Sequence, residues 1–390
     1  MVDSFKEKIL LFGPIADYGG REIECGLIAL VLSSKYEVSI CSTGTITNKS
    51  QLFNFNKNQR VFSIKELLFN RFFILKIAGF LSYFKNTCKG EVSNYVKNYF
   101  AKKFFQYDEK VEIVLKDLIS DFDAVFIIAQ LSSGLVSEII QLAKKDNKKV
   151  LFRTTGTITF SDYDYIELVD CFIHHSYNNA SRINKSKKFA VIDQCANNES
   201  DLLNIPLSQR QVCNFLILSR LSQEKGVEEI IDSFLKVSSE RDILFIAGNG
   251  ILEIYLKTKY KNSRNVKFLG FLSGSKLSDL IKSVDCLIIP SPEESGPLVG
   301  IESMCAGKIV ISTRVGAMEE RLQGTSNDYW FDYNDFKSFE KVFFEVKDLK
   351  ELEVKNISIE LRRKYIEEYS IDIISNKYLK IVEETLGICV

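Results

Sequence analysis

Two glutamates, Glu294 and Glu302, lie in the stretch PSPEESGPLVGIESMCAG with seven residues between them. A carboxylate accepts hydrogen bonds from hydroxyl groups, so one of the pair could bind the hydroxyls of a sugar and the other those of a ribose. An isolated pair at this spacing has an ordinary alternative, because Glu294 can be a solvated loop acid and Glu302 a salt-bridge partner. The elements around the pair therefore have to be considered with it.

The residues around the two glutamates predict a strand, a tight loop, a helix and a second strand. Residues 286–289 are a short apolar run of the kind that forms a buried parallel strand, and two prolines close behind it end the strand. A helical pattern covers 298–306, and a glycine ends it before the next apolar run at 309–312.

The start of the predicted helix has the features of an anion site. The free amide groups of Leu298, Val299 and Gly300 would point out of the helix start, where the helix dipole also favours negative charge. Gly296 lets a ligand approach the backbone, and Pro297 suits the first helical turn. The sequence thus places an anion site beside Glu294.

A second glycine-bearing loop follows the first apolar run of the chain. Residues 8–13 predict a strand, and the loop after it contains Gly19 and Gly20 before a helix over 21–33. Open α/β sheets bind ligands at such strand ends. The loop lacks G-x-G-x-x-G and the Gly-Lys-Ser/Thr of a P-loop, which argues against a dinucleotide site and against a nicotinamide dehydrogenase. A plain tight turn is the alternative.

Two cations follow the first predicted strand of the second half. The strand covers 213–220 and ends at Arg220, a helix begins at residue 227, and Lys225 lies in the loop between them. Fixed cations in a water-poor cleft stabilise a leaving group that gains negative charge. The alternative is that both are solvated surface charges. Further along, Gly248 and Asn249 follow a strand over 243–247, where a simple turn is the alternative role.

Composition limits the classes of function. The 390 residues contain 51 basic and 51 acidic side chains, a balance that gives no reason to expect a nucleic-acid partner. The nine cysteines have no C-x-x-C pair and no zinc-like spacing, so we expect reduced core thiols in a cytosolic protein. We also expect no signal peptide, no spanning helix, no catalytic metal and no cofactor.

The segment 61–110 is rich in phenylalanine, tyrosine, lysine and arginine. It predicts two or three amphipathic helices. Either their aromatic side chains pack on the sheet while the lysines face water, or the segment contacts a membrane surface or a lipid acceptor. Helices are also predicted over 335–350 and 361–386.

The frame PSxxExGPLVGIExMxxG resembles the signature of the retaining family 4 glycosyltransferases, within glycosyl transferases group 1. The stretch LSRLSQEKGVEEIIDSF is similar to the family's GRL…KG segment, and Gly248-Asn249-Gly250 resembles its Gly-Asp-Gly turn. The resemblance implies an α/β GT-B fold, with two Rossmann-like domains facing across a cleft. Implied limits are 1–205 for an acceptor-binding domain, 206–368 for a nucleotide-sugar-binding domain, and 369–390 for a C-terminal helix that crosses back to the first domain.

The resemblance also implies roles for individual residues. Glu294 would contact the hydroxyls of the transferred sugar and Glu302 the nucleotide ribose, and Phe271 would lie against the base. Catalysis would depend on three residues: Glu294, Lys225 and Arg220. Diphosphate binding is implied for the two cations and for two backbone sites: Gly19, Gly20, Arg220, Lys225, Gly296, Pro297, Leu298 and Val299. Gly248 and Asn249 would complete the donor site.

The implied reaction moves a sugar from a nucleotide-diphosphate sugar with retention of configuration. A UDP-sugar is the favoured donor, and a GDP-sugar is the alternative. The expected acceptor is a saccharide or a lipid-linked saccharide in the synthesis of capsule, O-antigen or lipopolysaccharide. The expected location is the cytoplasm, with peripheral contact at the inner membrane through residues 61–110.

The sequence departs from the family at two places. Thr155 stands where many relatives carry a histidine, and the only two histidines, His174 and His175, are adjacent at another strand end. Ala317 stands where relatives usually show a glycine, which could narrow the donor site. Two alternatives remain, a GT-B nucleotide-sugar 2-epimerase and a catalytically degenerate GT-B partner protein.

Overall fold

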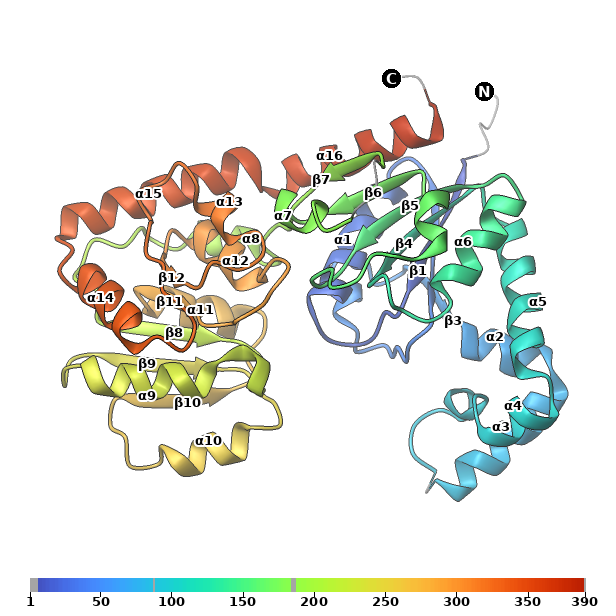
Figure 1. The fold of residues 1–390 in the computed structure, drawn as a ribbon, viewed down its shortest axis with the longest axis horizontal. Coiled ribbons are helices and arrows are strands. Elements are labelled where there is room, and N and C mark those ends of the chain that lie inside the picture. The colour runs from blue at the N-terminus through green and yellow to red at the C-terminus, as the bar shows by residue number, and fades with distance from the viewer. Residues whose placement is uncertain (1–5, 87, 184–186, 389–390) are drawn as a thin grey trace. The chain divides into compact units, whose positions relative to one another are not determined.

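The computed structural model of the protein describes residues 6–86, 88–183 and 187–388. It divides into two compact units, each built on a parallel β-sheet (Figure 1). The N-terminal unit contains Met1–His174, Ser181–Ile192 and Ser375–Val390, and the C-terminal unit contains His175–Ala180 and Asp193–Ile374.

The N-terminal sheet has seven strands in the order β3-β2-β1-β4-β5-β6-β7. Its strands are apolar runs that are largely buried, as expected where helices cover both faces of a parallel sheet. The order reverses between β1 and β4, the kind of position where open α/β sheets bind ligands. The strands are β1 (Lys8–Gly13), β2 (Glu37–Ser42), β3 (Arg60–Ser63), β4 (Ala124–Ala129), β5 (Lys149–Thr154), β6 (Cys171–His174) and β7 (Phe189–Val191).

Helices cover this sheet on both faces, with α1 on one side and α5 and α6 on the other (Figure 1). The helix α2 begins with a capping box, in which Ser63 and Glu66 each bond the other's backbone amide. The α-helices of this unit are α1 (Gly20–Ser33), α2 (Ile64–Arg71), α3 (Phe73–Lys85), α4 (Tyr99–Phe104), α5 (Tyr107–Ser120) and α6 (Val136–Lys145). Short 3-10 helices cover η1 (Gln51–Asn54), η2 (Val92–Tyr95) and η3 (Asp164–Leu168).

Within the described part of the chain, no single helix combines the length and apolar character needed to cross a bilayer. The pair α2 and α3 meets the length and composition criteria only when taken together, and it is bent by 114° at Phe72.

The C-terminal sheet has five strands in the order β10-β9-β8-β11-β12. Its core contains a cluster of packed aromatic rings that includes Phe215, Phe234 and Phe343. The strands are β8 (Asn214–Leu218), β9 (Ile243–Ala247), β10 (Val266–Gly270), β11 (Cys286–Ile289) and β12 (Ile309–Ser312). The helices are α7 (Tyr177–Ala180), α8 (Glu199–Leu203), η4 (Gln223–Lys225), α9 (Val227–Val237), α10 (Glu253–Lys259), α11 (Ser275–Ser283), α12 (Leu298–Ala306), α13 (Met318–Leu322), α14 (Phe336–Lys347) and α15 (Glu351–Glu368).

The single helix predicted over 361–386 is wrong, because the structure has two helices there. The first, α15, begins at Glu351, and α16 (Ile371–Leu386) begins after a break at Tyr369 and Ser370. No glycine or proline marks the break. It is held instead by Glu199, whose carboxylate accepts hydrogen bonds from the Tyr365 hydroxyl at 2.7 Å and from the Ile371 amide at 2.9 Å.

The boundaries of the two units differ from the predicted domain limits. The first boundary falls between Ile192 and Asp193, before the predicted one at 205 and 206, because residues 193–205 pack with the C-terminal unit. The second falls within α16, at Ser375. In the N-terminal unit, the Tyr378 hydroxyl donates to Glu24 at 2.8 Å, which attaches the end of the chain to α1.

Candidate active site

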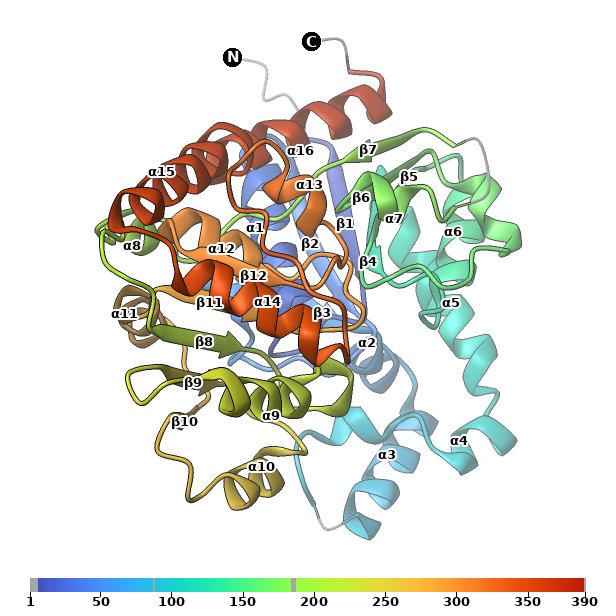
Figure 2. The same ribbon diagram turned by 60° about the vertical axis from the view of Figure 1, so that its left-hand side comes forward.

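The predicted signature lies where the order of the C-terminal sheet reverses. The neighbouring strands β8 and β11 run parallel, so the loops after them leave the same edge of the sheet (Figures 1 and 2). The chain proceeds from β8 to β9 on one side and from β11 to β12 on the other. Such a reversal leaves a crevice outside the carboxyl ends of the strands, the usual ligand site of this class of sheet.

The loops after β8 and β11 are joined by an ion pair between two predicted catalytic residues. The Lys225 ammonium group donates to the Glu294 carboxylate, whose same oxygen also accepts from the Ser291 hydroxyl at 2.9 Å. Both side chains are about four-fifths buried, with exposed fractions of 17% and 20%. The structure therefore brings together an acid and a base that lie 69 positions apart in the sequence.

The glycine after Lys225 explains how the two loops approach so closely. Gly226 has a left-handed backbone with φ of 64°, and a Cβ atom there would lie 2.6 Å from the Pro290 carbonyl oxygen and 2.8 Å from the Tyr333 ring. Gly316 is similar, since a Cβ atom would lie 2.3 Å from the Ser295 oxygen. Backbone packing thus fixes both sides of the loop that carries Glu294.

Arg220, the third predicted catalytic residue, is not part of this ion pair. Its side chain is 66% exposed, and its guanidinium lies 3.0 Å from the carboxylate of Glu224, which is four residues further along the same loop. The Ser222 hydroxyl also donates to Glu224, at 2.7 Å. The structure places Arg220 at the correct edge of the sheet but does not bring it to Glu294 or Lys225.

The other predicted donor-site residues of this unit lie at the ends of neighbouring strands. Gly248 has φ of 134°, and a Cβ atom there would lie 1.8 Å from the Ser219 oxygen, so the β9 loop packs against the end of β8. The Asn249 carbonyl accepts the Leu221 amide at 2.8 Å. Phe271, just after β10, exposes 51% of its surface at the same edge.

The start of α12 keeps two backbone amides available. Pro297 is the N-cap residue, and its carbonyl accepts the Gly300 amide at 3.0 Å. Among the described residues, the amides of Leu298 and Val299 have no hydrogen-bond partner. The geometry agrees with an anion site of the predicted kind.

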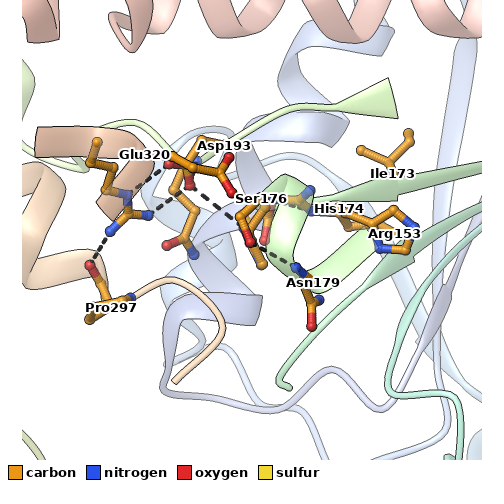
Figure 3. Close-up of polar contacts among 12 residues, drawn as sticks. Arg153, Ile173, His174, Ser176, Asn179, Asp193, Pro297 and Glu320 are labelled. Carbon is orange, nitrogen blue, oxygen red and sulfur yellow. Dashed lines mark hydrogen bonds and ion pairs between the residues drawn. The ribbon is translucent and has the colours of Figure 1, made fainter. Parts of the chain in front are cut away.

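A buried arginine that the sequence analysis missed, Arg321 of α13, fixes this helix start. Its fully buried guanidinium makes two hydrogen bonds of 2.7 Å to the Asp193 carboxylate and one of 2.6 Å to the Pro297 carbonyl (Figure 3). It also explains Gly296, because a Cβ atom there would lie 3.0 Å from the guanidinium. The available signal was helical spacing, since Arg321 shares the buried face of α13 with Met318 and Leu322.

Glu320, beside Arg321, binds a segment that follows β6. Its carboxylate accepts hydrogen bonds from the backbone amides of Tyr177 at 3.0 Å and Asn178 at 3.1 Å. His175 lies in this segment, with its Nδ1 atom 3.9 Å from the Asp193 carboxylate. These contacts explain why residues 175–180 belong to the C-terminal unit although the strand before them does not.

Glu302 lies on the buried face of α12, inside the signature helix. It is 6% exposed, and burial raises the pKa of its carboxyl from 4.5 to about 7. Among the described residues, its carboxyl has no hydrogen-bond or ion-pair partner. Glu302 is therefore a buried carboxyl with a raised pKa, a feature that is common at functional sites.

In the N-terminal unit, Gly19 and Gly20 lie after β1, where the order of that sheet reverses. Gly19 is the N-cap residue of α1 with φ of 141°, and its amide donates to the Gln51 side chain at 2.9 Å. The loop is further held by the Glu22 carboxylate, which accepts the Ala16 amide at 2.9 Å.

The residues at which the sequence departs from the family are all buried. The Thr155 amide donates to Ala129 at 2.9 Å. The Nδ1 atom of His174 lies 2.8 Å from the Thr154 hydroxyl, and burial, with a smaller contribution from the Arg153 charge, lowers the pKa of His174 to about 3. Ala317 is fully buried, so its methyl group does not face solvent. Among the described residues, no three or more His, Cys, Asp or Glu side chains are grouped as metal ligands.

Residues 208–368 match the family model of Glycosyl transferases group 1. A curated relative, an uncharacterized glycosyltransferase of Methanocaldococcus jannaschii, is 34% identical over 119 residues, which is 30% of each chain. Another, the N,N'-diacetylbacillosaminyl-diphospho-undecaprenol alpha-1,3-N-acetylgalactosaminyltransferase of Campylobacter jejuni, is 21% identical over 52% of this chain and 53% of its own length.

The structure is similar to that of the Anabaena protein HepE, solved in complex with UDP. The TM-score is 0.72 at 14% sequence identity, and the likeness covers 97% of this chain and 100% of that one. The predicted GT-B fold with two Rossmann-like domains is confirmed. Residues 208–368, within the C-terminal unit, are thus similar to a Glycosyl transferases group 1 domain, and the matches support the expected glycosyltransferase enzyme.

Substituting Arg321 should destabilise the C-terminal unit. Arg321→Ala leaves the Asp193 carboxylate buried without its partner, and we expect a loss of about 3–5 kcal/mol in the free energy of unfolding. The single tryptophan, Trp330, lies in this unit, so urea denaturation followed by its fluorescence measures the change. Arg241→Ala, at an exposed arginine, is the control and should change stability by less than about 0.5 kcal/mol. If Arg321→Ala and Arg241→Ala lowered the free energy of unfolding by the same small amount, the structural role assigned to Arg321 would be contradicted.

Glu302 should make the stability of the protein fall as the pH rises. With its pKa raised from 4.5 to about 7, the folded state keeps a proton that the unfolded state releases between these values. Glu302→Gln should therefore be more stable than the wild type by up to about 3 kcal/mol above pH 7, with little difference near pH 4.5. Urea denaturation at both pH values measures this. Glu345→Gln, on the exposed side of α14, should show no such pH dependence.

Proposed function

We propose that the protein is a retaining glycosyltransferase that moves a sugar from a nucleotide-diphosphate sugar to a saccharide or lipid-linked acceptor. The observation that carries the proposal is the ion pair between Lys225 and Glu294 at the reversal of the C-terminal sheet. An acid for sugar hydroxyls and a cation for phosphate stand next to each other there, beside the available amides of α12.

The proposed reaction separates the roles of the two charges. As the bond to the sugar breaks, the leaving nucleotide diphosphate gains negative charge, which Lys225, Arg220 and the amides of Leu298 and Val299 would stabilise. Glu294 would accept hydrogen bonds from the transferred sugar. Donor binding then exchanges the ammonium–carboxylate contact for an ammonium–phosphate contact and leaves Glu294 available to the sugar.

Glu302 is proposed to bind the hydroxyls of the nucleotide ribose. A buried carboxyl without a partner gains most from a ligand that supplies hydroxyl donors. Phe271, half-exposed at the end of β10, offers a ring against which the base can stack. Gly19 and Gly20 are proposed to contact the diphosphate from the N-terminal unit, and no metal or cofactor is proposed to take part.

UDP is the proposed nucleotide and GDP the alternative. The Anabaena protein with the same fold was solved with UDP and with UDP-glucose, which supports UDP without deciding the sugar. The name of the Campylobacter relative includes a diphospho-undecaprenol acceptor, and another relative comes from the cps region of Klebsiella pneumoniae. The first name supports a lipid-linked acceptor. We further propose a role in the synthesis of a surface polysaccharide such as capsule, O-antigen or lipopolysaccharide, and a location on the cytoplasmic face of the inner membrane.

A nucleotide panel tests the donor site directly. Melting temperature should rise with one of UDP, GDP, dTDP, ADP or CMP, or with its sugar conjugate. A ligand that binds only the folded protein adds about 2.7 kcal/mol at a hundred times its dissociation constant. Glu302→Gln should reduce the shift caused by the active nucleotide. If no nucleotide or sugar conjugate shifts the melting temperature, the degenerate-partner alternative is favoured.

Lys225→Ala and Glu294→Ala should each reduce sugar transfer by at least about a hundredfold, because each removes a charge that contacts the reacting donor. Transfer is measured with the active donor and a saccharide or lipid-linked acceptor. Lys341→Ala, an exposed lysine on α14, is the control and should keep full activity. Near-wild-type transfer by either site variant would remove that residue from the mechanism. Sugar conversion without any acceptor would favour the 2-epimerase.

A further inference from the structure

The solvent-facing side of α3 is apolar along the whole helix. Six large side chains on it have exposed fractions between 40% and 76%. At 100° per residue, their positions fall within about a third of the helix circumference. We call this set the α3 face, and it consists of Phe73, Ile74, Ile77, Phe80, Leu81 and Phe84.

The opposite side of α3 is the one that packs on the protein. Leu75, Ala78 and Gly79 are buried, and a Cβ atom at Gly79 would contact Val96 and the Val92 carbonyl, each at 3.5 Å. The helix is therefore anchored by small and apolar residues on one side, while its large apolar residues face outward. An exposed apolar surface of this extent indicates an interaction site.

The helix α4 continues the surface with further exposed aromatic rings and two lysines. Figures 1 and 2 show α3 and α4 beside each other at the end of the unit that lies away from the sheet. Tyr99, Phe100 and Phe104 are each more than half exposed. The Lys103 ammonium lies 5.4 Å from the centres of the Tyr99 and Phe104 rings, which joins positive charge to the apolar surface.

The charge of the segment differs sharply from that of the whole chain. Residues 67–107 contain seven basic side chains and one acidic side chain, whereas the chain as a whole has 51 of each. Exposed aromatic and aliphatic groups rimmed by lysine fit the interface of a bilayer that carries anionic lipids. A second copy of the chain fits less well, because a two-fold contact would bring two copies of the same positively charged surface together.

We propose that the α3 face, together with Tyr99, Phe100, Phe104, Lys102 and Lys103 of α4, binds the surface of an anionic phospholipid bilayer. In this arrangement α3 lies in the plane of the interface with its apolar face among the acyl chains, and the lysines reach the phosphate groups. The inference names the surface for the membrane location proposed above and rests on that part of the proposed function. It can be tested apart from the transfer reaction, since binding to vesicles requires no donor sugar.

Vesicle co-sedimentation tests the proposal. The full chain should bind vesicles of phosphatidylcholine with about 30% phosphatidylglycerol, and more weakly those of phosphatidylcholine alone. The triple substitution Phe73→Ser, Leu81→Ser and Phe84→Ser should reduce binding at least about tenfold, since it removes most of the inserted apolar surface. A matched triple at exposed apolar residues of the C-terminal unit should bind like the wild type: Phe344→Ser, Leu352→Ser and Ile366→Ser.

A fluorescence measurement distinguishes insertion from simple adsorption. The emission of Phe84→Trp should shift to shorter wavelength with anionic vesicles, and that of Phe344→Trp should not. Unchanged binding by the α3 triple, or no shift at Phe84→Trp, overturns the proposal. The proposal is also overturned, in favour of a second copy, by a different set of results. These are a wild type that is dimeric in light scattering and binds no vesicles, and an α3 triple variant that is monomeric.

Discussion

The contact between Arg321 and Asp193 is the constraint on which the candidate site depends. A fully buried guanidinium is tolerated only when its donors are satisfied, and here two of its bonds go to one carboxylate and a third to the Pro297 carbonyl. That carbonyl belongs to the N-cap residue of α12. The orientation of the α12 amides is therefore set by a charge pair that no ligand needs to complete.

The loops of the site are held mainly by backbone packing. Gly226, Gly248 and Gly316 each allow one strand-end loop to contact the backbone of the next, at distances where a Cβ atom would collide with a carbonyl oxygen. Because these contacts are mainly between main chains, they fix the backbone on which Lys225 and Glu294 stand. Preorganisation of this kind lets binding energy be used on the ligand instead of on ordering the protein.

The sequence predicted the regular parts of the fold well for a physical reason. The strands β1, β9, β11 and β12 and the helix α12 have the predicted limits, because apolar runs bounded by proline and glycine carry their own signals. The break between α15 and α16 has no such local signal, since a side chain about 170 positions away, that of Glu199, makes it.

Some residues of the candidate site could be predicted from the sequence, and others could not. The sequence pattern placed three features at one edge of the sheet, because loops after parallel strands meet there: Glu294, Lys225 and the start of α12. Arg321 was missed because its partner, Asp193, lies 128 positions away, and the helical spacing with Met318 and Leu322 indicates a buried face without indicating what the guanidinium binds. The pKa of Glu302 depends on what surrounds the helix, which the residue pattern of the helix does not contain.

The C-terminal unit contains two arrangements that the proposed nucleotide-sugar donor would improve. Glu302 keeps its carboxyl buried without a partner, which lowers stability at neutral pH, and Lys225 occupies Glu294, the group proposed for the sugar. A diphosphate offers Lys225 a second anion, and a ribose offers Glu302 hydroxyl donors. Both changes act in the same direction, so part of the cost of burying Glu302 would return as affinity for the proposed donor. A site built in this way discriminates against ligands that carry a phosphate but lack the hydroxyls, because these would leave Glu302 unpaired.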